Sequence, residues 1–119
     1  MRKYMPLKIN KVFFSGNLTD KPKINLTKKT LAKVVNFRLA SSKVFKTAGG
    51  ETKEDVCYVS VTAWTSLAEY SEKNLKKGDK VLVEGELQSK QYQKDDIKRN
   101  IIEILAKNIQ LLEKVVDDE

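Results

Sequence analysis

The sequence predicts one all-β domain that contains a single short helix. Short apolar or alternating stretches are separated by turn-forming residues, which is typical of strands. One stretch has its apolar residues at helical spacing. A chain of 119 residues, of which 40% are apolar, has the size of one domain with a core of ordinary extent. We therefore expect one compact fold over residues 1–112, followed by a short tail over residues 113–119.

The first half of the chain contains two predicted strands and two predicted loops. Residues 8–15 are β-prone and end before a cluster of turn formers, so they predict the first strand. Residues 23–33 are polar and rich in lysine, which favours a loop. Residues 34–41 alternate between apolar and polar side chains and predict the second strand. Residues 42–55 contain a Gly-Gly pair, and the simplest interpretation is a long hairpin loop.

The third predicted strand is VCYVSVTAW, residues 56–64, in which two kinds of side chain alternate. One face is small and apolar, as in an ordinary core: Cys57, Val59, Val61 and Ala63. The other face carries Tyr58, Ser60, Thr62 and Trp64. This outer face holds the only tryptophan of the chain, so we expect it to pack against a ligand or another part of a protein and not to face solvent alone.

A short helix follows the third strand. Thr65 or Ser66 can cap its start, and Gly78 can end it. The apolar residues between them recur at helical spacing, so we expect Tyr70 and Leu75 to pack beneath the helix.

Two further strands complete the predicted fold. Residues 79–93 and 100–112 form the fourth and fifth strands, and a charged turn over residues 94–99 joins them. Gly85 in mid-strand predicts a bulge or bend that lets a small sheet close. Five strands with one helix between the third and the fourth is the element order of the OB-fold, a five-stranded Greek-key barrel that binds oligonucleotides on one face.

The composition favours an anionic partner and disfavours catalysis. Lys and Arg number 23 against 16 Asp and Glu, a formal charge of +7 that attracts nucleic acid or an acidic surface. The chain has no histidine, which removes the commonest general base and most zinc sites. Its five glycines form no phosphate-binding motif. We therefore expect that the protein is not an enzyme and that it has no metal site and no cofactor.

The single cysteine and the hydropathy pattern indicate where the protein resides. Cys57 has no second cysteine with which to form an internal disulfide, and strand parity places it in the core. The sequence contains no apolar run of membrane-spanning length, and no such run follows the basic N-terminus as a signal peptide would require. We expect a soluble, cytoplasmic protein that does not bind membranes.

Four stretches stand out when they are taken together: INKVFFSGNLTDKP, VVNFRLASSK, VTAWTSLAEYSEKNLKKGDKVLVEGELQSKQYQ and AKNIQLL. In this order they resemble the bacterial single-stranded DNA-binding protein family, from about Ile9 to Leu112. The stretch from Val61 to Gln88 is the most specific, because a strand end, a helix and a strand match without a gap. The resemblance implies a homotetrameric OB-fold protein of the nucleoid. Its function would be sequence-nonspecific binding and protection of single-stranded DNA in replication, recombination and repair.

The resemblance also implies a stacking platform. In that family four aromatic positions stack on DNA bases, and the matching residues here are Phe45, Tyr58, Trp64 and Tyr92. Every base has a π-face, so stacking binds single strands without reading their sequence. A single outward aromatic just as often packs on a neighbouring strand or at an oligomer interface. The joint occurrence of four therefore favours a platform.

Basic residues near these aromatics predict contacts with phosphates. A lysine run alone is usually a solvated face, but these residues gather in two hairpins beside the aromatic positions: Lys43, Lys46, Lys53, Lys90, Lys94, Lys98 and Arg99. Arg38, outward on the second strand, either contacts DNA or pairs with a carboxylate across the sheet. Glu84 and Glu86 do not suit a basic groove, and we place them at a subunit interface or outside the DNA path.

The sequence departs from the family pattern in places. The loop before the second strand carries Lys28 and Lys29 where a glycine is usual, the turn near residues 94–98 is one residue shorter, and Asn100 stands where an aromatic often lies. The family ends in a long linker and an acidic tip that recruits replication and repair partners. This chain ends at KVVDDE, so we expect no partners that depend on such a tip. A truncated chain and a naturally short family member both fit this ending.

Two other functions fit the same pattern. One is an RNA-binding or primosome-type OB-fold module, since stacking does not separate RNA from DNA. The other is a protein-interaction domain that buries its outward aromatics against a partner.

The first strand also predicts a contact between subunits. It carries Val12 and Phe14 on one face and Phe13 on the other, so both of its faces are apolar.

Overall fold

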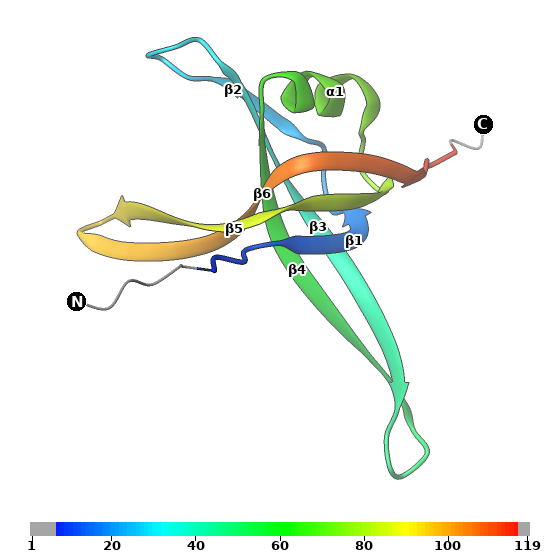
Figure 1. Cartoon of the computed structure of the whole chain (residues 1–119). Helices are drawn as coiled ribbons and strands as arrows, with labels where there is room; N and C mark the ends of the chain where they lie inside the picture. Colours follow the sequence, from blue (N-terminus) through cyan, green and yellow to red (C-terminus); the bar gives the residue numbers. More distant parts are fainter. Residues whose placement is uncertain (1–6, 117–119) are drawn as a thin grey trace.

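The computed structural model describes residues 7–116 and shows one sheet that closes on itself, with a helix against it (Figure 1). The elements are β1 Val12–Leu18, β2 Lys23–Leu26, β3 Lys33–Lys46, β4 Thr52–Trp64, α1 Ser66–Asn74, β5 Lys80–Lys94 and β6 Ile97–Glu113. The strand order is β1-β5-β6-β4-β3-β2, and β1 also pairs with β3. Because β1 pairs at both of its sides, five strands form a closed barrel, and β2 is an additional strand at the edge of β3. The predicted five-stranded OB-fold is confirmed.

The additional strand corrects one sequence prediction. Residues 23–33 are not only a loop, because Lys23–Leu26 pairs antiparallel with β3 as strand β2. The helix therefore lies between the fourth and fifth strands in chain order instead of the third and fourth. Lys23, Lys28 and Lys29 face solvent, and Lys23 does not prevent the backbone of β2 from pairing with β3, so a lysine-rich composition is compatible with a strand here.

The core of the barrel comes from the alternating strand positions. Its largest fully buried apolar side chains are Leu39, Ile104, Val35, Val61, Val81 and Val83. Helix α1 covers one end of the barrel, with Leu75 buried and Tyr70 packed against the core, as the helical spacing predicts. The helix ends at Asn74, before the predicted Gly78. Thr65 occupies the N-cap position, but its side chain makes no capping hydrogen bond.

Two long hairpins extend away from the barrel in different directions (Figure 1). In the first, which we call the β3–β4 arm, residues 41–57 are paired as far as Lys46 opposite Thr52. The predicted loop over residues 42–55 is therefore wrong, and only residues 47–51 separate the strands. The register places opposite charges across the strands, as with Lys43 opposite Asp55.

The second hairpin, the β5–β6 arm, comprises residues 88–103 and has a tighter turn than predicted. The strands pair as far as Lys94 opposite Ile97, which leaves Asp95 and Asp96 as a two-residue connection. Both aspartates have positive φ, 52° and 63°, the conformation that a type I′ hairpin turn requires. The charged turn is thus two residues long instead of spanning residues 94–99.

The length of the β3–β4 arm explains the error at Cys57. Strand parity places Cys57 on the same face as Val61 and Ala63, which are buried. Cys57 itself is exposed, because the pairing of β4 with β6 is confined to Val61 and Thr62, and at Cys57 the strand pairs only with β3, on the arm that extends from the barrel. The prediction of a core cysteine is therefore wrong.

The N-terminal strand starts later than predicted. It spans Val12–Leu18 instead of residues 8–15, and a side chain replaces backbone pairing just before it. The Asn10 amide nitrogen donates to the carbonyl oxygen of Leu87, and the Leu87 N–H donates to the Asn10 side-chain oxygen, each at 2.8 Å. These two bonds hold the chain ahead of β1 against β5.

The C-terminal end of the fold continues past residue 112. The Lys114 ammonium donates to the carbonyl oxygen of Asn74 at 3.1 Å, and the Val115 N–H donates to the Asp79 carboxylate at 2.8 Å. The basic N-terminus, residues 1–6, and the end of the predicted tail, residues 117–119, lie outside the described residues. Within residues 7–116, no helix has the length and apolar character needed to cross a membrane.

Candidate nucleic-acid interface

The outer face of β3 and β4 presents two aromatic rings on one side of the sheet. In the pairing of β4 with β3, Tyr58 lies opposite Ala40 and Trp64 lies opposite Val34. Tyr58 is 53% exposed and Trp64 is 38% exposed, as their common strand parity predicts. At about 3.3 Å per residue the two positions lie roughly 20 Å apart along the strand, far enough to contact different nucleotides.

Arg38 forms part of the same face. Its guanidinium carbon lies 4.6 Å from the centre of the Tyr58 ring, the geometry of a cation–π contact. Within residues 7–116, Arg38 forms no ion pair, so the alternative of a carboxylate partner across the sheet does not hold there. The guanidinium therefore places a positive charge over one face of the Tyr58 ring.

A buried polar pair fixes the sheet between the two aromatic rings. Thr62 lies between Tyr58 and Trp64 on β4, is fully buried, and donates its hydroxyl to the Asn36 side-chain oxygen at 2.7 Å. Because the bond joins β4 to β3, it keeps both strands in register at the centre of the platform. The two rings therefore lie on either side of a buried polar pair that joins β4 to β3.

The β5–β6 arm supplies a second aromatic face. Tyr92 is 40% exposed and lies directly opposite Arg99, while Lys90 and Lys94 share its side of the hairpin. Lys98 lies opposite Gln93 and thus projects from the other side. Part of the positive charge is matched locally: the Lys90 ammonium lies 3.1 Å from the Glu103 carboxylate, which also accepts from Gln88 at 2.8 Å.

A groove of about 400 Å³ connects the two faces. Arg38 and Ser60 line it from the sheet, and Ile101 and Glu103 line it from the base of the β5–β6 arm. Glu103 and Ile101 face the same side of that arm as Tyr92. A nucleic-acid strand lying in this groove would contact both the β3–β4 face and the β5–β6 arm.

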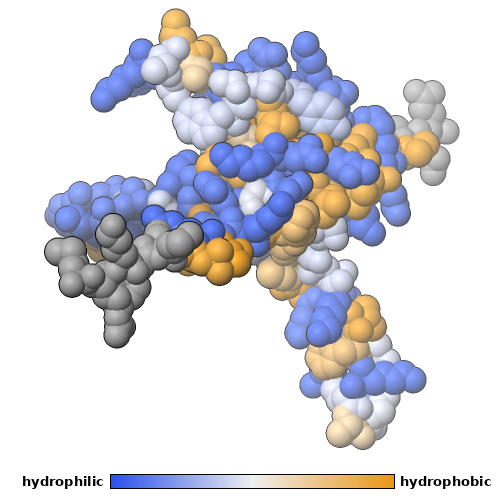
Figure 2. All heavy atoms as spheres, in the orientation of Figure 1, coloured by the Kyte–Doolittle hydropathy of each residue, from blue (hydrophilic) through white to orange (hydrophobic). Residues whose placement is uncertain are grey.

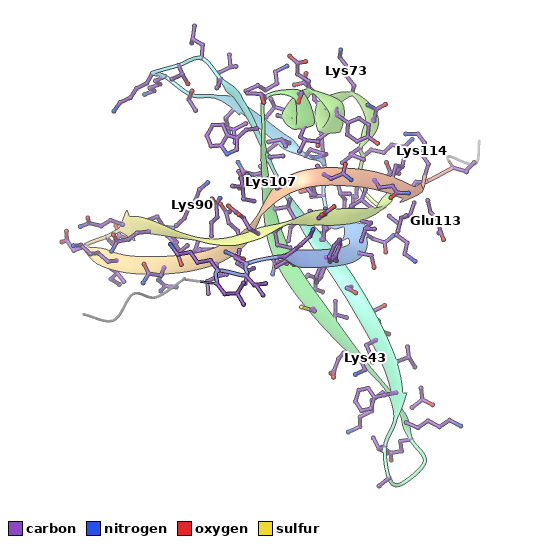
Figure 3. The ribbon with its side chains drawn as sticks, in the orientation of Figure 1. Lys43, Lys73, Lys90, Lys107, Glu113 and Lys114 are labelled. Carbon is purple, nitrogen blue, oxygen red and sulfur yellow. The ribbon has the colours of Figure 1, made fainter. Side chains whose placement is uncertain are left out.

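The β3–β4 arm divides its predicted site residues between two sides. Lys46 shares the side of Tyr58, whereas Lys43, Phe45 and Lys53 project from the opposite side, since the register places Phe45 opposite Lys53. Figure 3 shows Lys43 on this arm and Lys90 on the other arm, on elements that diverge. The structure therefore brings Tyr58, Trp64 and Arg38 together and keeps Phe45 apart from them.

Comparison with known proteins matches residues 9–112 to the Single-strand binding protein family. The chain belongs to this family. It is 44% identical over 107 residues to Single-stranded DNA-binding protein 2 of Chlorobaculum tepidum, which covers 89% of this chain and 72% of that protein. It is 36% identical over 104 residues to Single-stranded DNA-binding protein 1 of Streptococcus pyogenes, covering 87% and 77%. The resemblance noted in the sequence is confirmed.

Solved structures of similar proteins have the same fold. A Plasmodium falciparum SSB complex with ssDNA matches with a TM-score of 0.81 at 22% identity, covering 92% of this chain and 100% of that chain. A deletion mutant of the single-stranded DNA binding protein from Thermus aquaticus matches with a TM-score of 0.76 at 30% identity, covering 88% of this chain and 51% of that chain. These likenesses agree with the closed barrel described above.

Two basic residues of this family member were missed by sequence reasoning. Lys21 and Lys23 line the groove beside Arg38, because β2 runs next to β3 with Lys23 opposite Asn36. The signal that could have found them is the KIN segment, in which Ile24 alternates with two polar residues that project outward. Hydrophilic residues also cover the β5–β6 arm, at the left of Figure 2.

The acidic residues of the fold have local partners or are too dispersed to hold a metal. Glu84 forms an ion pair with Lys11 at 2.8 Å, on the barrel wall formed by β1 and β5. Over the described range 7–116, no three His, Cys, Asp or Glu side chains are grouped closely enough to bind a metal ion.

Proposed function

We propose that this chain binds single-stranded DNA by stacking bases on Tyr58 and Trp64 and by holding phosphates with the basic residues around the groove. The observation that supports this most directly is the shared outer face of Tyr58, Arg38 and Trp64, two exposed rings and a guanidinium on one pair of strands. Stacking on Tyr92 would continue the path onto the β5–β6 arm. Such contacts tolerate any base sequence.

The remaining predicted residues extend this surface. We propose that phosphate contacts come from the basic residues of both arms: Lys43, Lys46, Lys53, Lys90, Lys94, Lys98 and Arg99. Phe45 would stack on a base that passes along the other side of the β3–β4 arm. The protein would act without catalysis, in the cytoplasm and on the nucleoid, where it protects single strands during replication, recombination and repair.

Affinity for single-stranded DNA should fall as salt rises. If lysines and arginines neutralise phosphates, the log–log slope should be about −0.7 for each phosphate contacted. Titrations with oligo(dT) and with duplex DNA of equal length, at two salt concentrations, measure this slope. Duplex DNA should bind much more weakly at each salt concentration because its base faces are hidden within the stack.

Two outcomes of that titration, and one outcome of a competition with RNA, would contradict the proposal. Equal affinity for the duplex would mean that phosphate charge alone attracts the protein. A matched RNA oligomer that displaces oligo(dT) would indicate the RNA-binding alternative. Failure to bind any nucleic acid would favour the protein-interaction alternative, in which a protein partner covers the aromatic face.

We also propose that the chain forms a homotetramer. Phe13 is 61% exposed on β1, on the side away from Val12 and Phe14, which pack against the core. An exposed phenylalanine on a barrel strand is suited to a contact between subunits. Light scattering at micromolar concentration should give about four times the chain mass, and a mass near 13.6 kDa would contradict the proposal.

The side chain of Phe13 provides the matching test. Phe13→Lys should shift the protein toward smaller species because it places a charge where an apolar contact is expected. Phe13 contributes little to the core of the single chain, so circular dichroism should show an unchanged fold. A tetramer that persists in the variant would place the interface elsewhere.

A further inference from the structure

A second hollow lies beside the groove and shares a wall with it. This hollow, about 860 Å³, is lined by Ile24 and Asn25 of β2 and by Glu72 and Leu75 at α1. In Figure 1 the helix and β2 are neighbours on the same end of the barrel. The wall between the two hollows is one short segment, because both are lined by the same three residues: Asp20, Lys21 and Lys23.

The shared wall carries available positive charge. Lys21 and Lys23 are exposed, and within residues 7–116 neither forms an ion pair. Of the acids nearby, Glu72 pairs with Lys33 at 3.2 Å, whereas the Asp20 carboxylate accepts the backbone N–H of Lys21 at 2.8 Å and keeps its negative charge beside the two lysines. An anion that crosses the wall would therefore meet two free ammonium groups.

The second hollow combines polar rims with an apolar lining. Ile24, half-buried on β2, and Leu75, buried beside the helix, provide apolar surface, and Asn25 adds an amide that can donate and accept. A nucleotide presents the same combination, an apolar base face with polar edges and a charged phosphate. A small apolar ligand would form no charge contact with the two lysines at the wall.

We infer that the bound DNA strand leaves the groove beside Arg38, crosses the wall at Lys21 and Lys23, and enters the hollow between β2 and α1. The two ammonium groups bind successive phosphates at the crossing, and the nucleotides beyond it lie against Ile24 and Leu75. This inference rests on the proposed function, because it extends the path of the same strand. It makes the segment 21–23 a part of the binding site, although it carries no aromatic residue.

The test compares two variants that lose the same charge. Lys21→Gln/Lys23→Gln removes both ammonium groups of the wall, and Lys73→Gln/Lys77→Gln removes two exposed lysines at and after the end of α1 that line neither hollow. Binding of oligo(dT) is measured by Trp64 fluorescence over a salt series. The wall variant should lose about 1.4 from the log–log slope, or about 0.7 for each of two phosphates, while the control keeps the wild-type slope.

The magnitude follows from the slope. Between about 50 mM and about 200 mM salt, the ratio of wild-type to wall-variant affinity should fall about 7-fold, because a fourfold rise in salt acts through an exponent of about 1.4.

Asp20→Asn keeps an oxygen for the Lys21 N–H but removes a negative charge from the wall, so it should tighten binding at low salt. Saturating oligo(dT) should quench Trp64 equally in all these variants.

The outcomes separate this inference from the proposed function. If the wall variant and the control variant have the same slope, only the overall charge matters and the path across the wall is wrong. If Asp20→Asn weakens binding, the wall does not contact phosphates. Only a wild-type protein that fails to bind oligo(dT), or binds it without salt dependence, would contradict the proposed function itself.

Discussion

Replacing Tyr58 or Trp64 with alanine should weaken the binding of oligo(dT) by about 1–3 kcal/mol for each substitution, without unfolding the protein. Both rings are substantially exposed, so their removal opens no cavity in the core. Trp64 is the only tryptophan, and its quenching by oligo(dT) therefore reports on one position in wild-type and Tyr58→Ala proteins. A labelled oligonucleotide and its anisotropy replace this signal for Trp64→Ala.

The matched control lies on the inner face of the same strand. Val61 is fully buried in the core, so Val61→Ala should lower the free energy of unfolding by about 1–3 kcal/mol through the cavity that it leaves. The folded fraction should still bind oligo(dT) with normal affinity. Reversed effects, with the Tyr58 and Trp64 variants destabilised but binding normally, would show that the stacking platform lies elsewhere.

Strand parity was sufficient to predict the two faces of β4, and its failure at one residue has a physical cause. A period of two residues separates Val61 and Ala63 from Tyr58 and Trp64 wherever one side of the sheet is covered. Parity gives no information about where that cover ends. Cys57 has the correct parity for the core but lies on the arm, beyond the barrel.

The path around the groove could not be predicted because it depends on contacts distant in sequence. Arg38 and Ile101 line one groove although they are 63 positions apart in the chain. Strand β2 was missed because its alternation of Lys23 and Asn25 with Ile24 and Leu26 covers only four residues, too few to distinguish a strand from a loop. Its pairing with β3 brings Lys23 beside Asn36 and thus into the groove.

Gly85, in contrast, was identified from the sequence as a place where the sheet bends, and the structure confirms a register shift between Glu84 and Gly85. A β-bulge of this kind bends and twists the strand, which helps β5 to pair with β1 on one side and β6 on the other. The bend brings the backbone of β6 very close. An added Cβ at Gly85 would overlap the carbonyl oxygen of Leu105 and lie 2.9 Å from its carbonyl carbon.

Gly85→Ala should therefore lower the free energy of unfolding by at least about 3 kcal/mol, because the clash is with backbone and no side-chain rotamer can relieve it. Gly49→Ala is the matched control: its Cβ would meet only the Thr47 hydroxyl at 3.9 Å, so its effect should stay within about 0.5 kcal/mol. Urea unfolding followed by Trp64 fluorescence measures both variants. A Gly85→Ala protein as stable as the Gly49→Ala protein would mean that β5 and β6 can separate at the bulge without opening the barrel.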